Sequence, residues 1–280
     1  MEKAYKKYFW LFVLPTLIAF TLFFVIPFLM GIVLSFCKFT TVTNAHFVGL
    51  SNYIKAFSNK DFLNALWFTT KFTVVAVLTV NVFAFILAYA LTRGIKGTNL
   101  FRTTFFMPNL IGGIVLGYIW QLIINGVLAK FGVTITADPK YGFWGMVILM
   151  NWQLIGYMMI IYIAGIQNIP TELVEAAKID GASKLQALFK VTIPMVMSSI
   201  TICLFLTLTN SFKLFDQNYA LTAGGPAKKT SMLALDIYST FYGRNGWEGV
   251  GQAKAVIFFV LVGILALTQL YFTRRKEVES

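Results

Sequence analysis

The sequence is poor in charge and in the residues that build disulfide frameworks and metal sites. Only 12% of its 280 residues are charged, and histidine occurs once, at His46. The two cysteines, Cys37 and Cys203, lie in different parts of the chain. A disulfide framework needs paired cysteines, and a metal site needs clustered His, Cys or carboxylate ligands. The sequence therefore argues against both kinds of site.

A phosphate-binding loop is also missing. The pattern G-x-x-x-x-G-K-[ST] does not occur, and the stretch 224–230, GGPAKKT, is only superficially similar because Pro226 and the spacing disrupt it. We therefore expect no nucleotide cofactor on this chain.

Apolar residues are abundant: they make up 58% of the chain, and the mean hydropathy is +0.74. A helix of roughly 20 apolar residues crosses a bilayer core. Strands of a membrane barrel would alternate apolar and polar residues, whereas the runs found here are continuously apolar. The sequence predicts an all-α polytopic membrane protein, a single transmembrane domain over residues 1–280. The six runs without Asp, Glu, Lys or Arg are 8–36, 72–91, 103–127, 141–170, 191–212 and 255–273.

The basic residues near the two ends predict the orientation. Lys3, Lys6 and Lys7 precede the first run, which is too long for a signal peptide, and Arg274-Arg275-Lys276 follows the last. Six spans place both termini on one side, and the positive-inside rule favours the cytoplasm. The remaining basic residues are scattered over loops on both faces. The formal net charge of +12 therefore indicates the lipid bilayer and its anionic headgroups as the partner, and no nucleic acid.

The segment 168–194, between the fourth and fifth runs, contains residues that typically begin and end two short ordered helices. Pro170 ends the incoming helix, Thr171 is a candidate cap for the next, and Gly181 suits a tight turn. Ser183 and Gln186 have capping-box spacing. Apolar residues alternate with charged ones along the first helix, so something must cover them. Either the helix rests on lipid headgroups or it docks on a cytoplasmic partner.

The same segment resembles a known motif. Glu175-Ala176-Ala177, then Gly181, then after nine residues Val191-Thr192-Ile193-Pro194 is similar to the EAA loop of permease subunits in ATP-binding-cassette (ABC) importers. Val191 and Ile193 stand where isoleucine and leucine are usual, and both remain apolar. We call residues 168–194 the EAA segment.

The resemblance covers nearly the whole chain and is closest to sugar permeases related to the larger membrane subunit of the maltose transporter, without that subunit's large insertion and extra N-terminal helices. It rests on the stretches 47–53, 101–103, 107–108, 211–216 and 221–226.

This resemblance implies the type I ABC importer permease fold in a bacterial-type cell membrane, without enzymatic activity of its own. It also implies three kinds of partner: a second homologous permease subunit, a cytoplasmic ATPase dimer that binds Mg-ATP in place of this chain, and an extracytoplasmic sugar-binding protein. In such importers the EAA loop sits in a groove of the ATPase. The expected coupling residues are Glu175, Ala176, Ala177, Asp180, Gly181 and Pro194, with Glu175 making the docking contact and Gly181 the turn.

Polar residues inside spans are costly and mark candidate solute contacts. Aligned on the family landmarks, the expected solute path holds Gln153, Tyr157, Thr207, Asn210 and Ser211, with Asn210 departing from an aromatic position. Hydrogen bonding between helices is the alternative role for these residues, and we expect it of Asn81 and Asn125. Gly113 and Gly117 form a small-residue face for close helix approach.

The predicted function is the permease subunit of an ATP-driven importer that forms, with its paired permease, a path for an oligosaccharide or related carbohydrate. The alternatives are an ion-coupled secondary transporter, a channel or assembly subunit, and an ABC importer for another small polar solute such as glycerol phosphate. A proton relay through the membrane needs an acidic residue or histidine, and no predicted span contains one.

Overall fold

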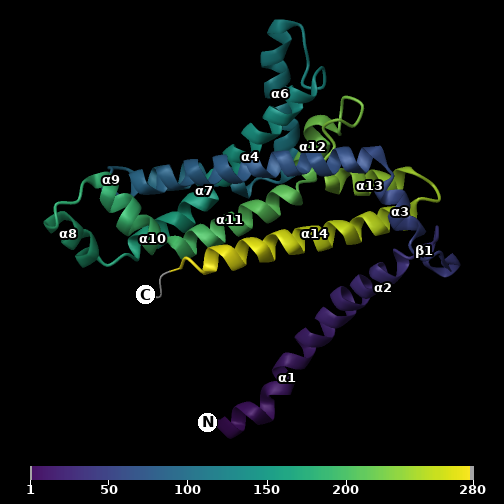
Figure 1. Cartoon of the computed structure of the whole chain (residues 1–280), viewed down its shortest axis with the longest axis horizontal. Helices are drawn as coiled ribbons and strands as arrows, with labels where there is room; N and C mark the ends of the chain where they lie inside the picture. The colour runs from purple at the N-terminus through teal and green to yellow at the C-terminus, as the bar shows by residue number, and fades with distance from the viewer. Residues whose placement is uncertain (1, 278–280) are drawn as a thin grey trace. The chain divides into compact units, whose positions relative to one another are not determined.

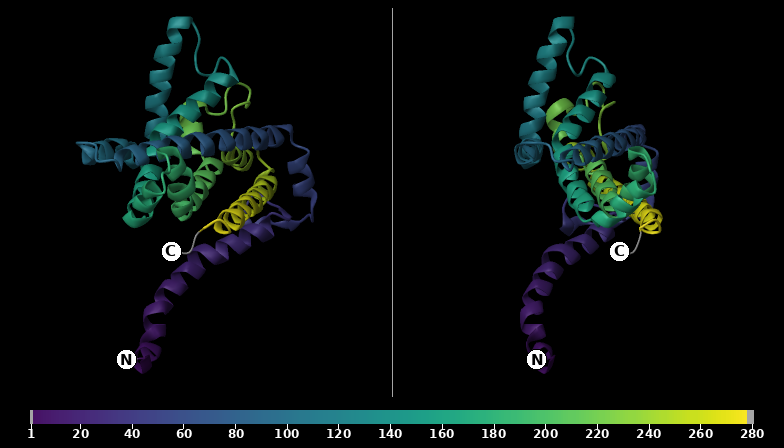
Figure 2. Two further views of the ribbon diagram at one scale, coloured as in Figure 1. Left: turned by 60° about the vertical axis from the view of Figure 1, so that its left-hand side comes forward. Right: turned by 90° about the vertical axis from the view of Figure 1, so that its left-hand side faces the viewer.

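A computed structural model describes residues 2–277, with the backbone alone for residues 2–8 (Figures 1 and 2). Helices dominate, as predicted, and the two short strands of the described part form one antiparallel pair. In chain order, with η for short 3-10 or π turns, the elements are α1 Glu2–Phe20, η1 Thr21–Val25, α2 Ile26–Leu34, β1 Cys37–Lys38, η2 Val42–Asn44, β2 His46–Phe47, α3 Ser51–Phe57, α4 Lys60–Leu91, α5 Thr98–Phe106, η3 Met107–Leu110, α6 Gly113–Leu128, η4 Ala129–Phe131, α7 Pro139–Gln167, α8 Thr171–Ile179, α9 Lys184–Ala187, η5 Leu188–Thr192, α10 Ile193–Met195, α11 Met197–Phe212, α12 Asp216–Thr222, α13 Leu233–Gly243 and α14 Glu248–Arg274.

Five helical stretches of the described chain are long and apolar enough to cross a membrane, and a bent pair supplies a sixth. The five are Phe9–Leu34, Lys60–Leu91, Gly113–Phe131, Pro139–Gln167 and Glu248–Arg274, and the pair is Lys184–Met195 with Met197–Phe212. The all-α polytopic class is confirmed, and each predicted run overlaps one of these spans.

The helices extend beyond the uncharged runs. Helix α4 begins at Lys60 instead of residue 72, and α14 begins at Glu248 instead of residue 255, so both contain charged side chains. An uncharged run marks the part of a helix suited to hydrocarbon, whereas backbone hydrogen bonding continues into the interface. The run therefore underestimates the helix length.

The third predicted span is broken. Residues 103–127 divide between α5 and α6, with the 3-10 turn η3 and the extended residues Ile111 and Gly112 between them. Pro108 has no backbone N–H to donate to the carbonyl four residues before it, and the chain leaves the helical region three residues later, at Ile111. The span that remains starts at Gly113.

Residues 1–60 and 237–259 form one compact unit. Its centre is Asn52 of α3, a buried side chain that donates to the carbonyl oxygens of Ser35 at 2.9 Å and Cys37 at 2.8 Å. The hydroxyls of Tyr53 and Ser35 lie 2.6 Å apart. The Asn-Tyr pair of the family-like stretch 47–53 thus fixes α3 against the end of α2 and the start of β1.

Residues 61–236 and 260–280 form the second unit. Its core contains a row of α4 side chains at every fourth position: Phe72, Ala76, Val80, Ala84 and Ala88, all fully buried. Residues four apart lie on one helix face. The small alanines in this row let α4 pack against the larger buried methionines and tyrosine of α7, which include Met146, Met150 and Tyr162.

Glycines permit two of the closest helix contacts in this unit. A methyl group at Gly117 of α6 would lie 2.5 Å from the Cβ of Ala220 in α12, and one at Gly113 would lie 2.8 Å from the Cβ of Asp216. The close approach expected at Gly113 and Gly117 is confirmed. At Gly156 of α7, a Cβ would lie 1.8 Å from the carbonyl oxygen of Phe105.

Gly156→Ala is therefore expected to force α5 away from α7 and to lower stability by about 1–3 kcal/mol, the usual cost of overpacking, or more. Backbone atoms block the position and no rotamer change relieves the clash. Gly126→Ala is the matched control, because Gly126 is also in a helix and nothing lies within 4 Å of its added methyl group. The apparent Tm of the purified proteins measures both. Equal melting temperatures for the two variants would contradict the packing described.

Candidate functional site

Helix α8, the first part of the EAA segment, ends in a glycine turn. Gly181 has a φ of +76°, in the left-handed region that favours glycine. Its N–H donates to the carbonyl of Lys178 at 3.1 Å, and the N–H of Ala182 donates to the carbonyl of Ala177 at 2.9 Å. This is the Schellman pair of hydrogen bonds, which closes the C-terminus of a helix. The turn expected at Gly181 is present.

The next helix begins as predicted, at a capping box. The backbone N–H of Gln186 donates to Ser183 Oγ at 3.3 Å, and the backbone N–H of Ser183 donates to Gln186 Oε1 at 2.8 Å. The cap expected of Thr171 is wrong: α8 starts at Thr171, the preceding Pro170 is the N-cap residue, and no side chain bonds there. Helices α8 and α9 are thus held by local hydrogen bonds at both ends of the turn between them.

The fifth predicted span, 191–212, is not one straight helix. The π turn η5 precedes α10, and α10 and α11 meet at Val196 with a bend of 70°. Pro194 lies in α10, two residues before the bend, and has no N–H to donate to the carbonyl four residues before it. A proline at this point favours the change of direction between the EAA segment and α11.

The EAA segment presents apolar side chains on its surface. Ile179 is 86% exposed, Leu185 68% and Phe189 64%, with Leu173 also exposed. The predicted docking residue Glu175 is exposed among them, as are Ala176 and Asp180, whereas Ala177 is partly buried. Several large apolar side chains exposed on one short segment are typical of an interaction site.

A cavity of about 530 Å³ lies between α7, the end of α11, the start of α12 and η3. Its volume is in the range of small-molecule sites. The lining combines amide, hydroxyl, charged and aromatic groups, which suits a polar solute with many hydroxyls. The lining residues are Asn109, Met150, Gln153, Leu154, Tyr157, Asn210, Lys213, Leu214, Phe215, Asp216 and Gln217.

Three of the five residues expected on the solute path line this cavity: Gln153, Tyr157 and Asn210. Gln153 Oε1 accepts a hydrogen bond of 2.7 Å from Gln217 Nε2, so its position is fixed from α12. Tyr157 has Phe106 of α5 as an edge-on neighbour, with ring centroids 6.3 Å apart. The cavity wall therefore combines side chains of α7, α11 and α12.

The other two, Thr207 and Ser211, are fully buried and do not line the cavity. Ser211 Oγ donates to the carbonyl of Thr207 at 2.7 Å, and Thr207 Oγ1 donates to that of Cys203 at 2.7 Å. Thr207 Oγ1 also accepts from Asn81 Nδ2 at 3.3 Å. Asn81 Oδ1 in turn accepts a hydrogen bond of 2.8 Å from the Tyr162 hydroxyl. These side chains join α4, α7 and α11, which confirms the packing role expected of Asn81.

The sequence reasoning missed Asn109 and Gln217 as cavity residues. Asn109 directly follows the Met107-Pro108 break, and a polar residue beside a broken span is a signal that would have found it. Gln217 lies one residue into α12, outside every predicted span. Lys213 and Asp216 also line the cavity, and no ion pair joins them in the described chain.

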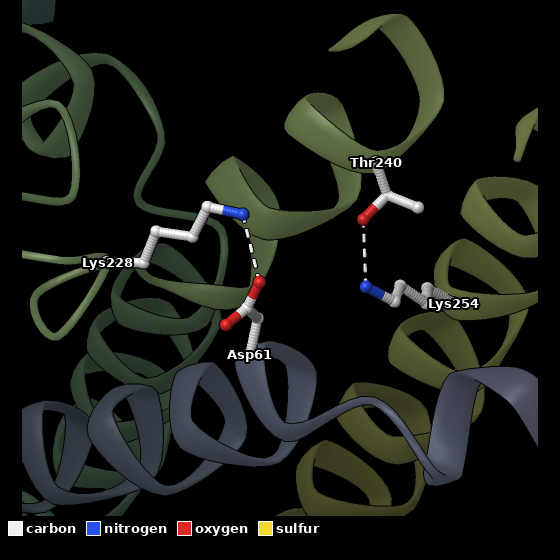
Figure 3. Close-up of polar contacts among 4 residues, drawn as sticks. All are labelled: Asp61, Lys228, Thr240 and Lys254. Atoms are coloured by element: carbon white, nitrogen blue, oxygen red, sulfur yellow. Dashed lines mark hydrogen bonds and ion pairs between the residues drawn. The ribbon is translucent and has the colours of Figure 1, made fainter. Parts of the chain in front are cut away.

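The loop 223–232, which carries the Gly-Gly-Pro stretch, is held in place by hydrogen bonds to a buried side chain. Buried Asn218 donates to the carbonyl of Thr230 at 2.8 Å and accepts from the N–H of Met232 at 2.9 Å. Lys228, at the tip of the loop, reaches Asp61 of α4 at 2.9 Å (Figure 3). The loop therefore has one defined conformation against the start of α4.

A second lysine in Figure 3 belongs to the other unit. Lys254 of α14 is fully buried and donates to Thr240 Oγ1 of α13 at 2.8 Å. Because a buried ammonium must be hydrogen bonded, this contact ties the two helices together within that unit.

Comparison with known proteins assigns a class to this architecture. Residues 93–278 match the family described as binding-protein-dependent transport system inner membrane component. The chain is 42% identical, over 97% of its length and 96% of the relative, to a protein of Thermoanaerobacterium thermosulfurigenes named probable starch degradation products transport system permease protein AmyD. It is 32% identical to multiple sugar-binding transport system permease protein MsmF of Streptococcus mutans, over 99% of both chains.

The fold matches a solved chain of a bacterial ABC transporter involved in the import of the acidic polysaccharide alginate, with a TM-score of 0.81 at 20% identity over 98% of both chains. The chain belongs to the family of binding-protein-dependent transport system inner membrane components. It is a multi-pass permease of the type I ABC importer fold.

Proposed function

We propose that this chain is one of two paired permease subunits of an ATP-driven importer for an oligosaccharide or related carbohydrate. The observation that carries the proposal is the likeness over nearly the full length to permeases whose names specify starch degradation products and multiple sugars. Linear sugars are recognised by amide hydrogen bonds and aromatic faces, and the cavity offers Gln153, Asn109 and Tyr157. The cavity chemistry therefore supports the same solute class.

In this proposal the EAA segment docks in a separate cytoplasmic ATPase, one half of a dimer, and both termini of the chain are cytoplasmic. The exposed apolar residues Ile179, Leu185 and Phe189 and the exposed charge of Glu175 support a protein contact. Hydrogen bonds at both ends of the turn between α8 and α9 support a segment rigid enough to transmit a push to α11. The proposed coupling set is Glu175, Ala176, Ala177, Asp180, Gly181 and Pro194.

The family description, binding-protein-dependent transport, supports delivery of the solute by an extracytoplasmic binding protein. We place the contact for that protein on the side of the loop 223–232, at the opposite end of α7 from the EAA segment. The loop's fixed conformation supports recognition by a rigid partner.

Reconstitution tests this function. Proteoliposomes that contain this chain, its paired permease, the ATPase and the binding protein should take up labelled maltodextrins only with internal ATP. Imposed proton or sodium gradients without ATP should give no uptake. Gradient-driven uptake without ATP would favour the secondary transporter instead. Titration of the binding protein with a panel of sugars and with glycerol phosphate by calorimetry identifies the solute.

A further inference from the structure

A second cavity in the same unit, of about 470 Å³, combines aromatic rings with lysines. It lies where the first turns of α4, the start of α7 and the loop 223–232 meet. Its charged lining consists of Lys71, Lys140 and Lys229, and its aromatic lining includes Trp67 and Trp144. No carboxylate is among its lining residues.

The aromatic side of this cavity is an ordered cluster. Phe68 and Phe143 meet edge to face with ring centroids 5.7 Å apart, and Phe143 meets Trp144 at 5.4 Å. Trp67 is 62% exposed and lies under the Lys71 ammonium, 5.0 Å from Nζ to the ring centroid. These contacts hold one lysine over an exposed apolar surface.

The three ammonium groups have no internal counterion. Within residues 2–277, none of the three lysines takes part in an ion pair, and the carboxylate of Asp61 is already bound to Lys228 (Figure 3). Asp138 accepts a hydrogen bond from the backbone N–H of Lys140 at 2.7 Å as the N-cap of α7. The cavity therefore carries an uncompensated positive charge that attracts an anion.

The position along the helices indicates the depth of the cavity in the membrane. Lys71 directly precedes the uncharged run 72–91, and Lys140 directly precedes the run 141–170. Exposed tryptophans and lysines at the ends of apolar runs are typical of the headgroup region. Both the polar and the apolar halves of a lipid are therefore available at this depth.

We infer that this cavity binds the headgroup of an anionic phospholipid, with the phosphate among Lys71, Lys140 and Lys229 and the upper acyl chain against Trp67 and Trp144. An acidic patch on a partner protein would match the charge, but it would not need two exposed indoles at the hydrocarbon boundary. The inference does not depend on which solute the protein carries.

Native mass spectrometry of the purified importer complex, titrated with phosphatidylglycerol or phosphatidylcholine, tests the site. Because each basic residue near an anionic surface contributes about 1 kcal/mol, the triple variant Lys71→Gln, Lys140→Gln, Lys229→Gln should bind phosphatidylglycerol roughly a hundredfold more weakly. The matched control Lys96→Gln, Lys130→Gln, Lys276→Gln removes the same charge from exposed positions outside the cavity and should bind as the wild type does. Replacing the three cavity lysines by arginine should preserve binding and shows that the fold is intact.

Three results would overturn the inference. The glutamine triple variant could bind phosphatidylglycerol as the wild type does. Soluble glycerol phosphate could bind the wild type as tightly as the lipid, which would make this a site for a free phosphate. The glutamine variant could also keep its lipid and lose only its association with the binding protein, which would make the cavity a protein-docking site.

Discussion

A Gly181→Val variant is expected to lose about nine tenths or more of its ATP-dependent uptake and to recover little ATPase on purification. Gly181 has a φ of +76°, and a side chain in that conformation costs roughly 1–2 kcal/mol, which corresponds to about a tenfold change in population. Valine, branched at Cβ, is among the residues least suited to it. The two hydrogen bonds that close α8 would open, and the exposed docking side chains would lose their fixed orientation.

The measurements are uptake in proteoliposomes and the ATPase-to-permease ratio of the purified complex. Gly181→Asn is the matched control, since asparagine tolerates the left-handed region, and it should retain most of the uptake. Nothing lies within 4 Å of a Cβ added at Gly181, so a clash at Cβ does not account for a difference between the two variants. A valine variant with a normal ATPase ratio and normal uptake would refute the docking role of the EAA segment.

The double variant Gln153→Ala, Tyr157→Ala is expected to lower the maximal uptake rate by about fivefold to roughly a hundredfold. One lost hydrogen bond contributes about 0.5–1.5 kcal/mol, and a lost aromatic contact contributes a similar amount. Both side chains line the 530 Å³ cavity. If a binding protein delivers the solute, that protein sets the half-saturating concentration, and this concentration should change little.

Thr209→Val is the matched control for the cavity. The Thr209 hydroxyl donates to the carbonyl of Phe205 in its own helix at 2.9 Å and does not line the cavity. Initial rates over a range of solute concentrations separate the two variants. If the double variant transports at the wild-type maximal rate while Thr209→Val is impaired, the solute path lies elsewhere.

The local structure of the EAA segment was easier to predict from the sequence than the residues of the cavity. Its turn at Gly181 and its capping box at Ser183 and Gln186 depend on residues within a few positions of one another, and both form as expected. The cap expected at Thr171 was wrong, and the predicted span 191–212 is bent by 70° at Val196. A proline, Pro170 or Pro194, lies within two residues of each of these points, and the apolar pattern does not reveal its effect on the backbone.

The residues that line the 530 Å³ cavity could be predicted only in part from the sequence. In a span that is apolar on all sides, the helical period does not indicate which face is buried, so Asn210, Thr207 and Ser211 were equivalent in sequence. Asn210 lines the cavity, whereas Ser211, its neighbour, is fully buried and donates to the carbonyl of Thr207 at 2.7 Å. Asn109 and Gln217 join the cavity because α5, α7 and α12 pack together, at contacts far apart in the chain.

The sequence by itself determined the membrane class, the number of apolar spans and the local turns of the EAA segment, because hydrocarbon thickness and hydrogen bonds between near neighbours act on contiguous residues. Only the tertiary structure decided which polar groups face a cavity and which join helices. That choice depends on how each helix is rotated about its axis, and the rotation is set by close contacts such as that of Gly156 with Phe105, between residues distant in sequence.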